Sequence, residues 1–170
     1  LYTIDTNYGD FGFKYVHVHY DTKNQAAGGD SRRLSDAGQA GGVLDGLAPV
    51  RGVDNLLGLN GSIEDKYTMK MTWRKGPYEV FLSGTQWGEF FESAHTETID
   101  GVREMWVVDE MTMLNLTLGY KFDNDFRVRL QVKNLEDARA PLADETFGMY
   151  WGDLHTDFGR NYNVEFYKKF

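Results

Sequence analysis

Apolar and polar residues alternate with a period of two in several separate stretches of this chain. In the clearest stretch, 126–133, every second residue is Phe, Leu or Val, and the residues between them are Arg, Gln and Lys. A β-strand sends successive side chains to opposite faces of its sheet, so each such stretch predicts a strand with one apolar and one polar face. We expect strands over 64–75, 78–90, 111–122, 125–135 and 160–170, paired antiparallel in sequence order.

The first part of the chain has a less regular pattern. Its apolar residues change parity between residues 11 and 20, which predicts a bulge near Gly12, because one inserted residue moves every later side chain to the other face. The two groups are Phe11, Phe13 and Tyr15 on one parity, and Val16, Val18 and Tyr20 on the other. With this strand the pattern predicts about six strands, each near the roughly 9–11 residues that cross a bilayer at a tilt.

The connections between the expected strands alternate in length. Residues 75–77 and 123–125 are tight turns rich in turn-forming residues, whereas 22–64, 92–109 and 136–158 are long and polar. Short turns at one edge of a sheet and long loops at the other are typical of bacterial outer-membrane barrels. A β-sandwich has mostly short connections at both edges. We therefore expect an all-β fold, an antiparallel transmembrane β-barrel of which this chain carries about six C-terminal strands with long extracellular loops.

Composition adds a few restrictions. The mean hydropathy is -0.51, and the chain contains no apolar run of about 18 residues, so no transmembrane helix is expected. The aromatic content of 15% is consistent with aromatic girdles at the two membrane surfaces. The net charge of -8 argues against nucleic acid as a partner.

The expected number of strands suggests a piece of a larger protein. About six strands cannot close a transmembrane barrel, since the smallest have about eight. An open sheet with an apolar face and two bare edges would be prone to aggregate. We therefore expect residues 1–170 to be the C-terminal segment of a barrel whose other strands lie outside this chain.

Three short motifs resemble the end of TonB-dependent outer-membrane receptors. In that family the penultimate strand carries a motif close to xNLxDxxx, which Asn134-Leu-Glu-Asp137 matches, and Gly-Arg introduces the closing strand, as Gly159-Arg160 does here. The family's last strand ends in Phe, as this one does at Phe170. Lys168 departs from the pattern, since it stands on the apolar parity, but near the membrane surface its ammonium can reach water.

The resemblance implies energy-coupled import across the outer membrane of a Gram-negative bacterium. Such receptors are barrels of roughly 22 strands with a plug in the lumen. They import a ferric siderophore, haem, cobalamin or an oligosaccharide, with energy from TonB acting through the plug, which is not in this chain. Further expected partners are the lipid of the outer membrane and, through the strand ending in Phe170, the barrel-assembly machinery. Two alternatives remain open: another outer-membrane barrel, such as a porin or adhesin, and a soluble β-sandwich binding module.

The sequence shows no motif typical of an enzyme active site. Ser31, Ser35 and Ser83 lack a Gly-x-Ser-x-Gly context, and no EF-hand loop is present. No catalytic residue, cofactor or metal ion is therefore expected. His17 and His19 share one strand face and could chelate a metal ion, but we expect imidazoles on the lumen wall, bonded to neighbours or water.

Aromatic residues in the expected loops are the candidates for contact with cargo, whether a small molecule or an oligosaccharide. Aromatic faces beside polar groups bind sugars, haem and aryl siderophores alike. The alternative is that these rings pack against neighbouring loops or lie in the outer girdle. The candidates are Trp106, Tyr150, Trp151 and His155, with Phe147 in the same loop.

Basic residues gather on the polar parity near the short turns. Isolated cations in a confined space raise each other's energy, and water screens them incompletely. We hypothesise that they pair with carboxylates on the lower surface of the plug; the alternative is a solvated, unpaired wall. The residues are Arg74, Lys121, Arg127 and Arg129, with Lys169 nearby, and only Glu79 and Glu165 oppose them. The residues expected to face lipid are Tyr67, Met69, Met71, Leu116, Leu118, Val128, Leu130, Val164 and Phe166.

Overall fold

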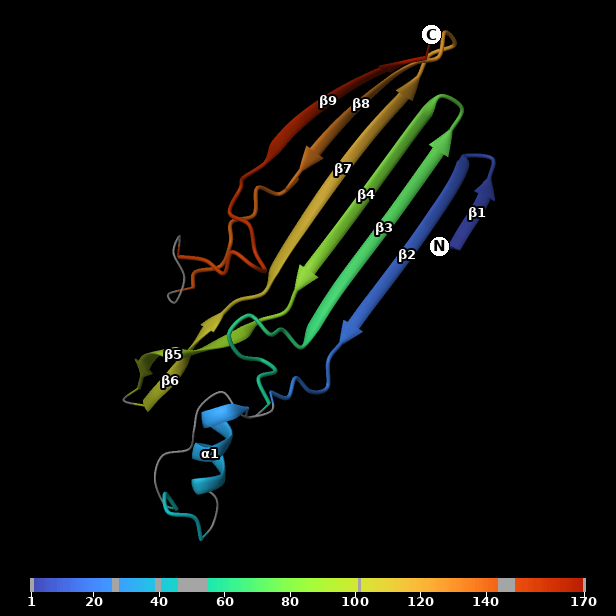
Figure 1. Ribbon diagram of the computed structural model, residues 1–170. Helices are drawn as coiled ribbons and strands as arrows, with labels where there is room; N and C mark the ends of the chain where they lie inside the picture. The colour runs from blue at the N-terminus through green and yellow to red at the C-terminus, as the bar shows by residue number, and fades with distance from the viewer. Residues whose placement is uncertain are drawn as a thin grey trace.

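The computed structural model describes residues 2–25, 28–38, 41–45, 55–100, 102–143 and 149–169. Phe147 and Phe170 lie outside these residues. The elements are β1 (Tyr2–Thr6), β2 (Gly9–His19), α1 (Gly29–Ala37), β3 (Asp65–Lys75), β4 (Tyr78–Trp87), β5 (Phe90–Ile99), β6 (Val102–Val108), β7 (Met111–Lys121), β8 (Phe126–Lys133) and β9 (Asn161–Lys168) (Figure 1). The regular structure of the described residues is thus mostly antiparallel β-sheet with almost no helix, and these residues include no helix with the length and apolarity that crossing a membrane requires.

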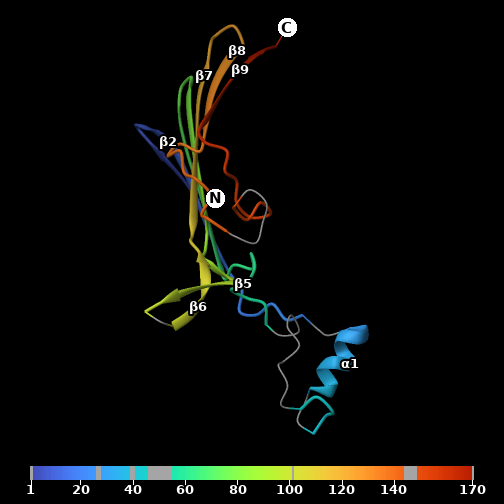
Figure 2. The same ribbon diagram turned by 90° about the vertical axis from the view of Figure 1, so that its left-hand side faces the viewer.

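Seven strands form one sheet in the order β1-β2-β3-β4-β7-β8-β9, and all neighbours are antiparallel. The prediction for the five regular strands is confirmed, since β3, β4, β7, β8 and β9 pair in sequence order. Figure 2 shows the sheet nearly edge-on as a single layer. The described strands leave β1 and β9 as free edges and do not close into a barrel.

The predicted bulge near Gly12 is wrong. The register between β2 and β3 runs without interruption from Asp10 opposite Arg74 to His19 opposite Asp65. Phe11, Phe13 and Tyr15 therefore keep to the face that carries Trp73, Met71 and Met69, and this face continues into His17 and His19. The apolar Val16 and Val18 point to the other face, where they pair with Thr68 and Lys66.

The two faces of the sheet differ in polarity. One row across the sheet consists of Ile4, Phe11, Trp73, Val80, Leu118, Leu130 and Val164. On the opposite face, the row one residue further along consists of Gly12, Thr72, Phe81, Thr117, Gln131 and Asn163. Many residues of the apolar face are exposed, including Phe13 at 46%, Val164 at 50% and Phe166 at 69%. The sheet thus presents an open apolar surface, which soluble monomers seldom do.

The longer connections lie together at one end of the sheet, opposite the tight turns (Figure 1). They contain more regular structure than predicted: the β5–β6 hairpin spans 90–108 and so covers most of 92–109, and α1 lies within 22–64. The buried core is also at this end, where Ile63, Phe90, Val108 and Ala143 pack with Trp87, Trp106, Trp151 and Leu154. The loop region therefore has its own small hydrophobic core.

Asn134 joins the end of β8 to the segment that leads into β9. It is 2% exposed and has a φ of 54°. Its side chain accepts the Ala138 N–H at 2.8 Å and donates to the carbonyl oxygens of Ala138 and Phe158 at 2.8 and 3.1 Å. Asp137 accepts the Arg160 N–H at 2.6 Å, close beside Gly159, where a Cβ atom would come within 2.8 Å of the carboxylate. The Asn-Leu-Glu-Asp and Gly-Arg motifs are therefore bonded to each other.

Candidate functional site

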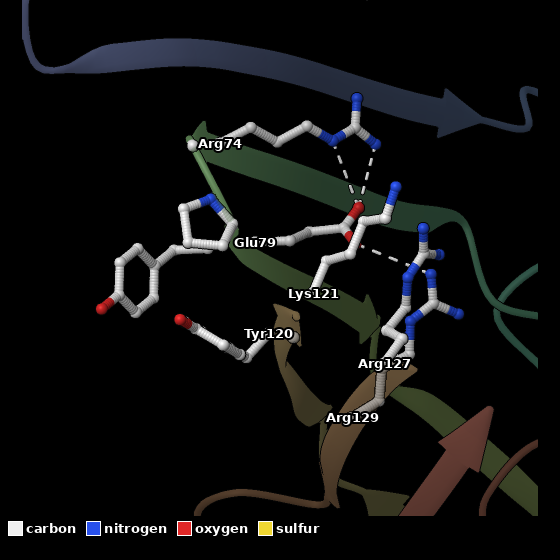
Figure 3. Close-up of a pocket in the computed structure, with 10 residues that line it drawn as sticks. Arg74, Glu79, Tyr120, Lys121, Arg127 and Arg129 are labelled. Atoms are coloured by element: carbon white, nitrogen blue, oxygen red, sulfur yellow. Dashed lines mark hydrogen bonds and ion pairs between the residues drawn. The ribbon is translucent and has the colours of Figure 1, made fainter. Parts of the chain in front are cut away.

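Four cations surround one pocket at the tight-turn end of the polar face. Arg74 comes from β3, Lys121 from β7, and Arg127 and Arg129 from β8, with Glu79 of β4 between them (Figure 3). We call this site the basic pocket; its volume is about 330 Å³. The structure thus brings together all four basic residues that the sequence singled out. Lys169 is exposed beyond the end of β9 and does not line the pocket.

Glu79 bridges two of the three arginines in the basic pocket, Arg74 and Arg129. Its Oε1 accepts from Arg74 Nε at 3.2 Å and Nη2 at 3.0 Å, and its Oε2 lies 3.6 Å from Arg129 Nη2. Arg129 reaches this carboxylate because Gly119 stands between Glu79 and Arg129 in the register. A glycine there leaves the space over β7 open for the arginine side chain. The sequence shows Gly119 only as a polar-parity residue, so this bridge was not foreseen.

The basic pocket keeps an excess of positive charge. Four cations against the single carboxylate of Glu79 give its lining a formal charge of +3. Lys121 lies 3.4 Å from Asp125 in the adjoining turn, whereas Arg127 has no hydrogen bond or ion pair with any residue that the structure describes. The Nε of Arg129 is buried and has no partner among the described residues. This arrangement suits an anionic group, because guanidinium donors bind carboxylates or phosphates in a bidentate manner.

The aromatic loop residues lie in the core of the loop region. Trp151 packs edge-on against Phe90 with ring centroids 5.4 Å apart, and His155 lies between Phe90 and Trp87 at 6.2 and 6.3 Å. Trp106 donates its Nε1–H to the Leu142 carbonyl at 3.1 Å. Trp151 and His155 therefore pack against other rings, and Trp106 is hydrogen-bonded to the backbone. Their partners Trp87 and Phe90 are not among the candidates from the sequence, because both fall at the end of an expected strand.

His155 and Tyr150 differ in burial. His155 is 4% exposed, and neither ring nitrogen has a hydrogen-bond partner among the described residues. Burial lowers the pKa of this histidine, because an apolar environment disfavours the charged imidazolium. Tyr150 is half-buried beside Trp151 in the chain. His155, one of the four candidates for cargo contact, is therefore a neutral imidazole in the core of the loop region.

His17 and His19 are not on the polar face. Both lie on the apolar face at the loop end of β2, whereas the parity in the sequence predicts the polar face for them. His17 Nε2 and His19 Nδ1 both contact Asp65 Oδ1, at 2.6 and 2.8 Å. The error followed from the supposed bulge, which reversed the assignment of faces in this strand.

Asp157 ties the segment before β9 to the loop that follows β8. Its carboxylate forms a double ion pair with Arg139 and accepts the Ala140 N–H at 3.0 Å. These donors stabilise the ionised form and lower the pKa of Asp157 to about 2. A carboxyl group whose pKa is lower in the folded than in the unfolded chain stabilises the fold above the unfolded value.

The stabilisation from Asp157 should therefore be lost on acidification. Asp157→Asn should lower the melting temperature at pH 7, and this difference from the unmodified protein should vanish as the pH falls from the unfolded pKa of about 3.9 toward about 2. Circular dichroism melts over this pH range measure the effect. Asp153→Asn, an exposed carboxylate in the same loop, is the control and should show no such trend. A difference that persists unchanged at pH 2 would contradict the ion pair.

Comparison of the chain with protein-family models, curated proteins and solved structures found no match. The features of the molecule that bear on function are the polarity of the two faces, the positions of turns and loops, and the basic pocket.

Proposed function

We propose that this chain forms part of the wall of a Gram-negative outer-membrane β-barrel of the TonB-dependent receptor type. The observation that carries this proposal is the seven-stranded antiparallel sheet whose exposed side chains are apolar on one face and polar on the other. Lipid against the apolar face and a water-filled lumen against the polar face would give each face an environment of matching polarity. The free edges at β1 and β9 support the presence of further strands, since a membrane sheet must close on itself.

Aromatic rings at the tight-turn end support a membrane boundary at that level. Tyr78, Tyr120, Phe122, Phe126 and Phe166 form a continuous chain of ring contacts, with centroids 5.0, 4.6, 5.5 and 6.2 Å apart in that order. Outer-membrane barrels carry such girdles where the apolar band meets the headgroups. We assign this end to the periplasm and the loop end to the outside.

The particular class rests on the resemblance in the last strands. The Asn-Leu-x-Asp and Gly-Arg motifs are bonded to each other through Asn134, Asp137 and Arg160, so they act as one unit that fixes the approach to β9. In a receptor of this class, the cargo would be a scarce nutrient and TonB would act through a plug. Porins and adhesins remain the alternative within the outer membrane.

Cysteine labelling tests the membrane proposal directly, because the chain contains no native cysteine. Single cysteines at Asp153 in the loop region and at Asn124 in the tight turn should behave differently in intact cells. A membrane-impermeant maleimide should modify Asp153→Cys from outside and leave Asn124→Cys unmodified until the outer membrane is opened. Equal labelling of both sites in intact cells, or recovery of the protein outside the outer-membrane fraction, would refute the proposal.

The basic pocket should hold the plug in this proposed receptor. Its charge of +3 faces the lumen, where acidic residues on the lower surface of a plug would pair with it. In the complete receptor, Arg127→Glu together with Arg129→Glu should replace attraction by repulsion and loosen the plug. Cells should then become sensitive to large antibiotics that the outer membrane normally excludes.

The control for this double variant reverses the same number of charges at a site that does not line the basic pocket. Arg32→Glu together with Arg33→Glu on α1 should leave antibiotic sensitivity unchanged. Antibiotic inhibition zones measure the effect, and heat-modified gel mobility establishes that each receptor has folded and inserted. An inserted Arg127/Arg129 variant with normal permeability would show that the wall is solvated and does not hold the plug.

A further inference from the structure

Three metal-ligating side chains meet at the loop end of the β2–β3 pair. His17 and His19 are two residues apart in β2 and therefore share a face, and Asp65 stands opposite His19 in β3. One ligand atom from each, His17 Nε2, His19 Nδ1 and an Asp65 carboxylate oxygen, lies within 4.8 Å of the other two. The side chains are 40%, 50% and 31% exposed, so an ion can reach them from solvent.

We propose that His17, His19 and Asp65 form a binding site for a borderline divalent cation, with zinc as the best fit. Imidazole is a preferred ligand of Zn²⁺, Cu²⁺ and Ni²⁺, whereas Ca²⁺ and Mg²⁺ require oxygen ligands. Two histidines and one carboxylate make one of the ligand sets that hold zinc with a fourth position open. The proposal depends only on the β2–β3 register and so stands apart from the proposed transport function.

The present distances are close to those that a zinc ion needs. Both histidine nitrogens point at the same oxygen, Asp65 Oδ1, at 2.6 and 2.8 Å. Tetrahedral zinc with bonds of about 2.0–2.2 Å spaces its ligands about 3.3–3.6 Å apart. Small rotations of the two imidazoles would open this space, and no backbone movement is required, since the strand register already sets the three side chains on one face.

Two neighbours orient the histidines for this role. The Tyr67 ring stacks on the His17 ring with centroids 4.4 Å apart and an interplanar angle of 15°. Asp21 Oδ1 lies 3.5 Å from His19 Nε2, on the far side of the ring from Asp65. Zinc bound at Nδ1 would replace the proton that this nitrogen now donates to Asp65, and the ring would then carry its proton on Nε2, on the side of Asp21. Carboxylates placed in this way fix the tautomer of metal-ligating histidines in many proteins.

Zinc titration of the folded, untagged full chain in detergent micelles tests the site. After removal of metals with a chelator, zinc chloride should bind with one saturable site per chain by isothermal titration calorimetry. His17→Ala, His19→Ala and Asp65→Asn should each weaken this binding by at least about tenfold. Calcium chloride should give no saturable heat. Absence of a saturable zinc site, or equal affinity in the variants, would overturn the proposal.

Two matched controls separate the site from general effects of charge and composition. Asp10→Asn removes a carboxylate from the same strand on the other face and should leave zinc affinity unchanged. The double variant His19→Val with Val18→His keeps the composition but moves one imidazole to the polar face. It should therefore weaken zinc binding as much as His19→Ala does. If the relocated histidine binds zinc like the native one, the β2–β3 site is wrong.

A spectroscopic measurement on the unmodified protein covers the case in which a variant fails to fold. With one equivalent of copper chloride, the electron paramagnetic resonance spectrum should show hyperfine coupling to two imidazole nitrogens. Coupling to one nitrogen or none would place the metal elsewhere and overturn the proposal.

Discussion

Replacing Asn134 with alanine should lower the free energy of unfolding by about 3–5 kcal/mol. The side chain of Asn134 is buried and bonds the N–H of Ala138 and the carbonyl oxygens of Ala138 and Phe158. Alanine would remove all three bonds. A backbone group left without a partner costs about 1–3 kcal/mol where it is shielded from water, as at the half-buried Ala138, and less at the exposed Phe158. The positive φ of 54° adds strain, because asparagine tolerates the left-handed region better than alanine does.

Urea unfolding followed by tryptophan fluorescence in detergent micelles measures this loss. Asn124→Ala is the matched control, since Asn124 lies in an exposed turn and accepts a single hydrogen bond from the Phe126 N–H at 3.3 Å. Asn134→Asp keeps the oxygen acceptor and loses the two bonds that the Asn134 amide donates, so its cost should fall between the two. Similar losses of unfolding free energy in Asn134→Ala and Asn124→Ala would show that the hydrogen bonds of Asn134 do not stabilise the connection between β8 and β9.

The regular strands could be predicted because their two faces differ in polarity along the whole strand. In β8, for instance, Phe126, Val128 and Leu130 lie on one face and alternate with arginines, and the structure keeps this parity. Register follows from such a pattern, because a shift by one residue would exchange the faces.

The same reasoning failed in β2, where polarity along one face changes partway. The row that begins with Phe11 and Phe13 continues into His17 and His19, at the end of the strand nearest the loops. Val16 and Val18 lie on the other face, but in the sequence they look like a continuation of the apolar row after a change of parity. The hydrophobic pattern of β2 alone does not distinguish an unbroken strand from a bulged one. The pairing with β3 does, because Tyr67 lies opposite His17 and Met69 lies opposite Tyr15 in an uninterrupted register.

The sequence predicts a loop where most of the β5–β6 hairpin lies, because tertiary contacts hold this hairpin in place. Phe90 and Val108 are fully buried against residues from distant segments, among them Ile63 and Ala143. The strands between these anchors are rich in Glu and Thr, which gives no periodic apolar face. The remaining local signal is Asp100-Gly101, a dipeptide that favours tight hairpin turns.

The candidate sites divide in a similar way. The grouping of Arg74, Lys121, Arg127 and Arg129 could be foreseen, because strand parity and distance from the turns place them on one face. The ion pair of Glu79 with Arg129 could not, because it spans two strand pairs across Gly119 and strand parity alone does not predict such a contact. The packing of Trp151 and His155 against Phe90 depends on chain segments far apart in sequence.

If the apolar face contacts lipid, as proposed, then Leu116→Arg should destabilise the protein by about 2–4 kcal/mol. Leu116 is at the centre of β7, between Leu82 and Val132 on the neighbouring strands. A guanidinium there would have to leave water for the middle of the apolar band. Leu118→Arg should cost less, because Leu118 is two residues nearer the aromatic chain at Tyr120, from which arginine can reach the headgroups.

The control is Thr117→Arg, which adds the same side chain one residue away on the opposite, polar face beside Gln131. It should cost less than about 0.5 kcal/mol, since the arginine would enter a water-filled lumen. Equilibrium unfolding in lipid vesicles gives all three values in one host. A cost at Thr117 equal to or above that at Leu116 would reverse the assignment of faces. Equal costs at Leu116 and Leu118 would argue against a bilayer, because a protein partner covering this face would impose no gradient with depth along the strand.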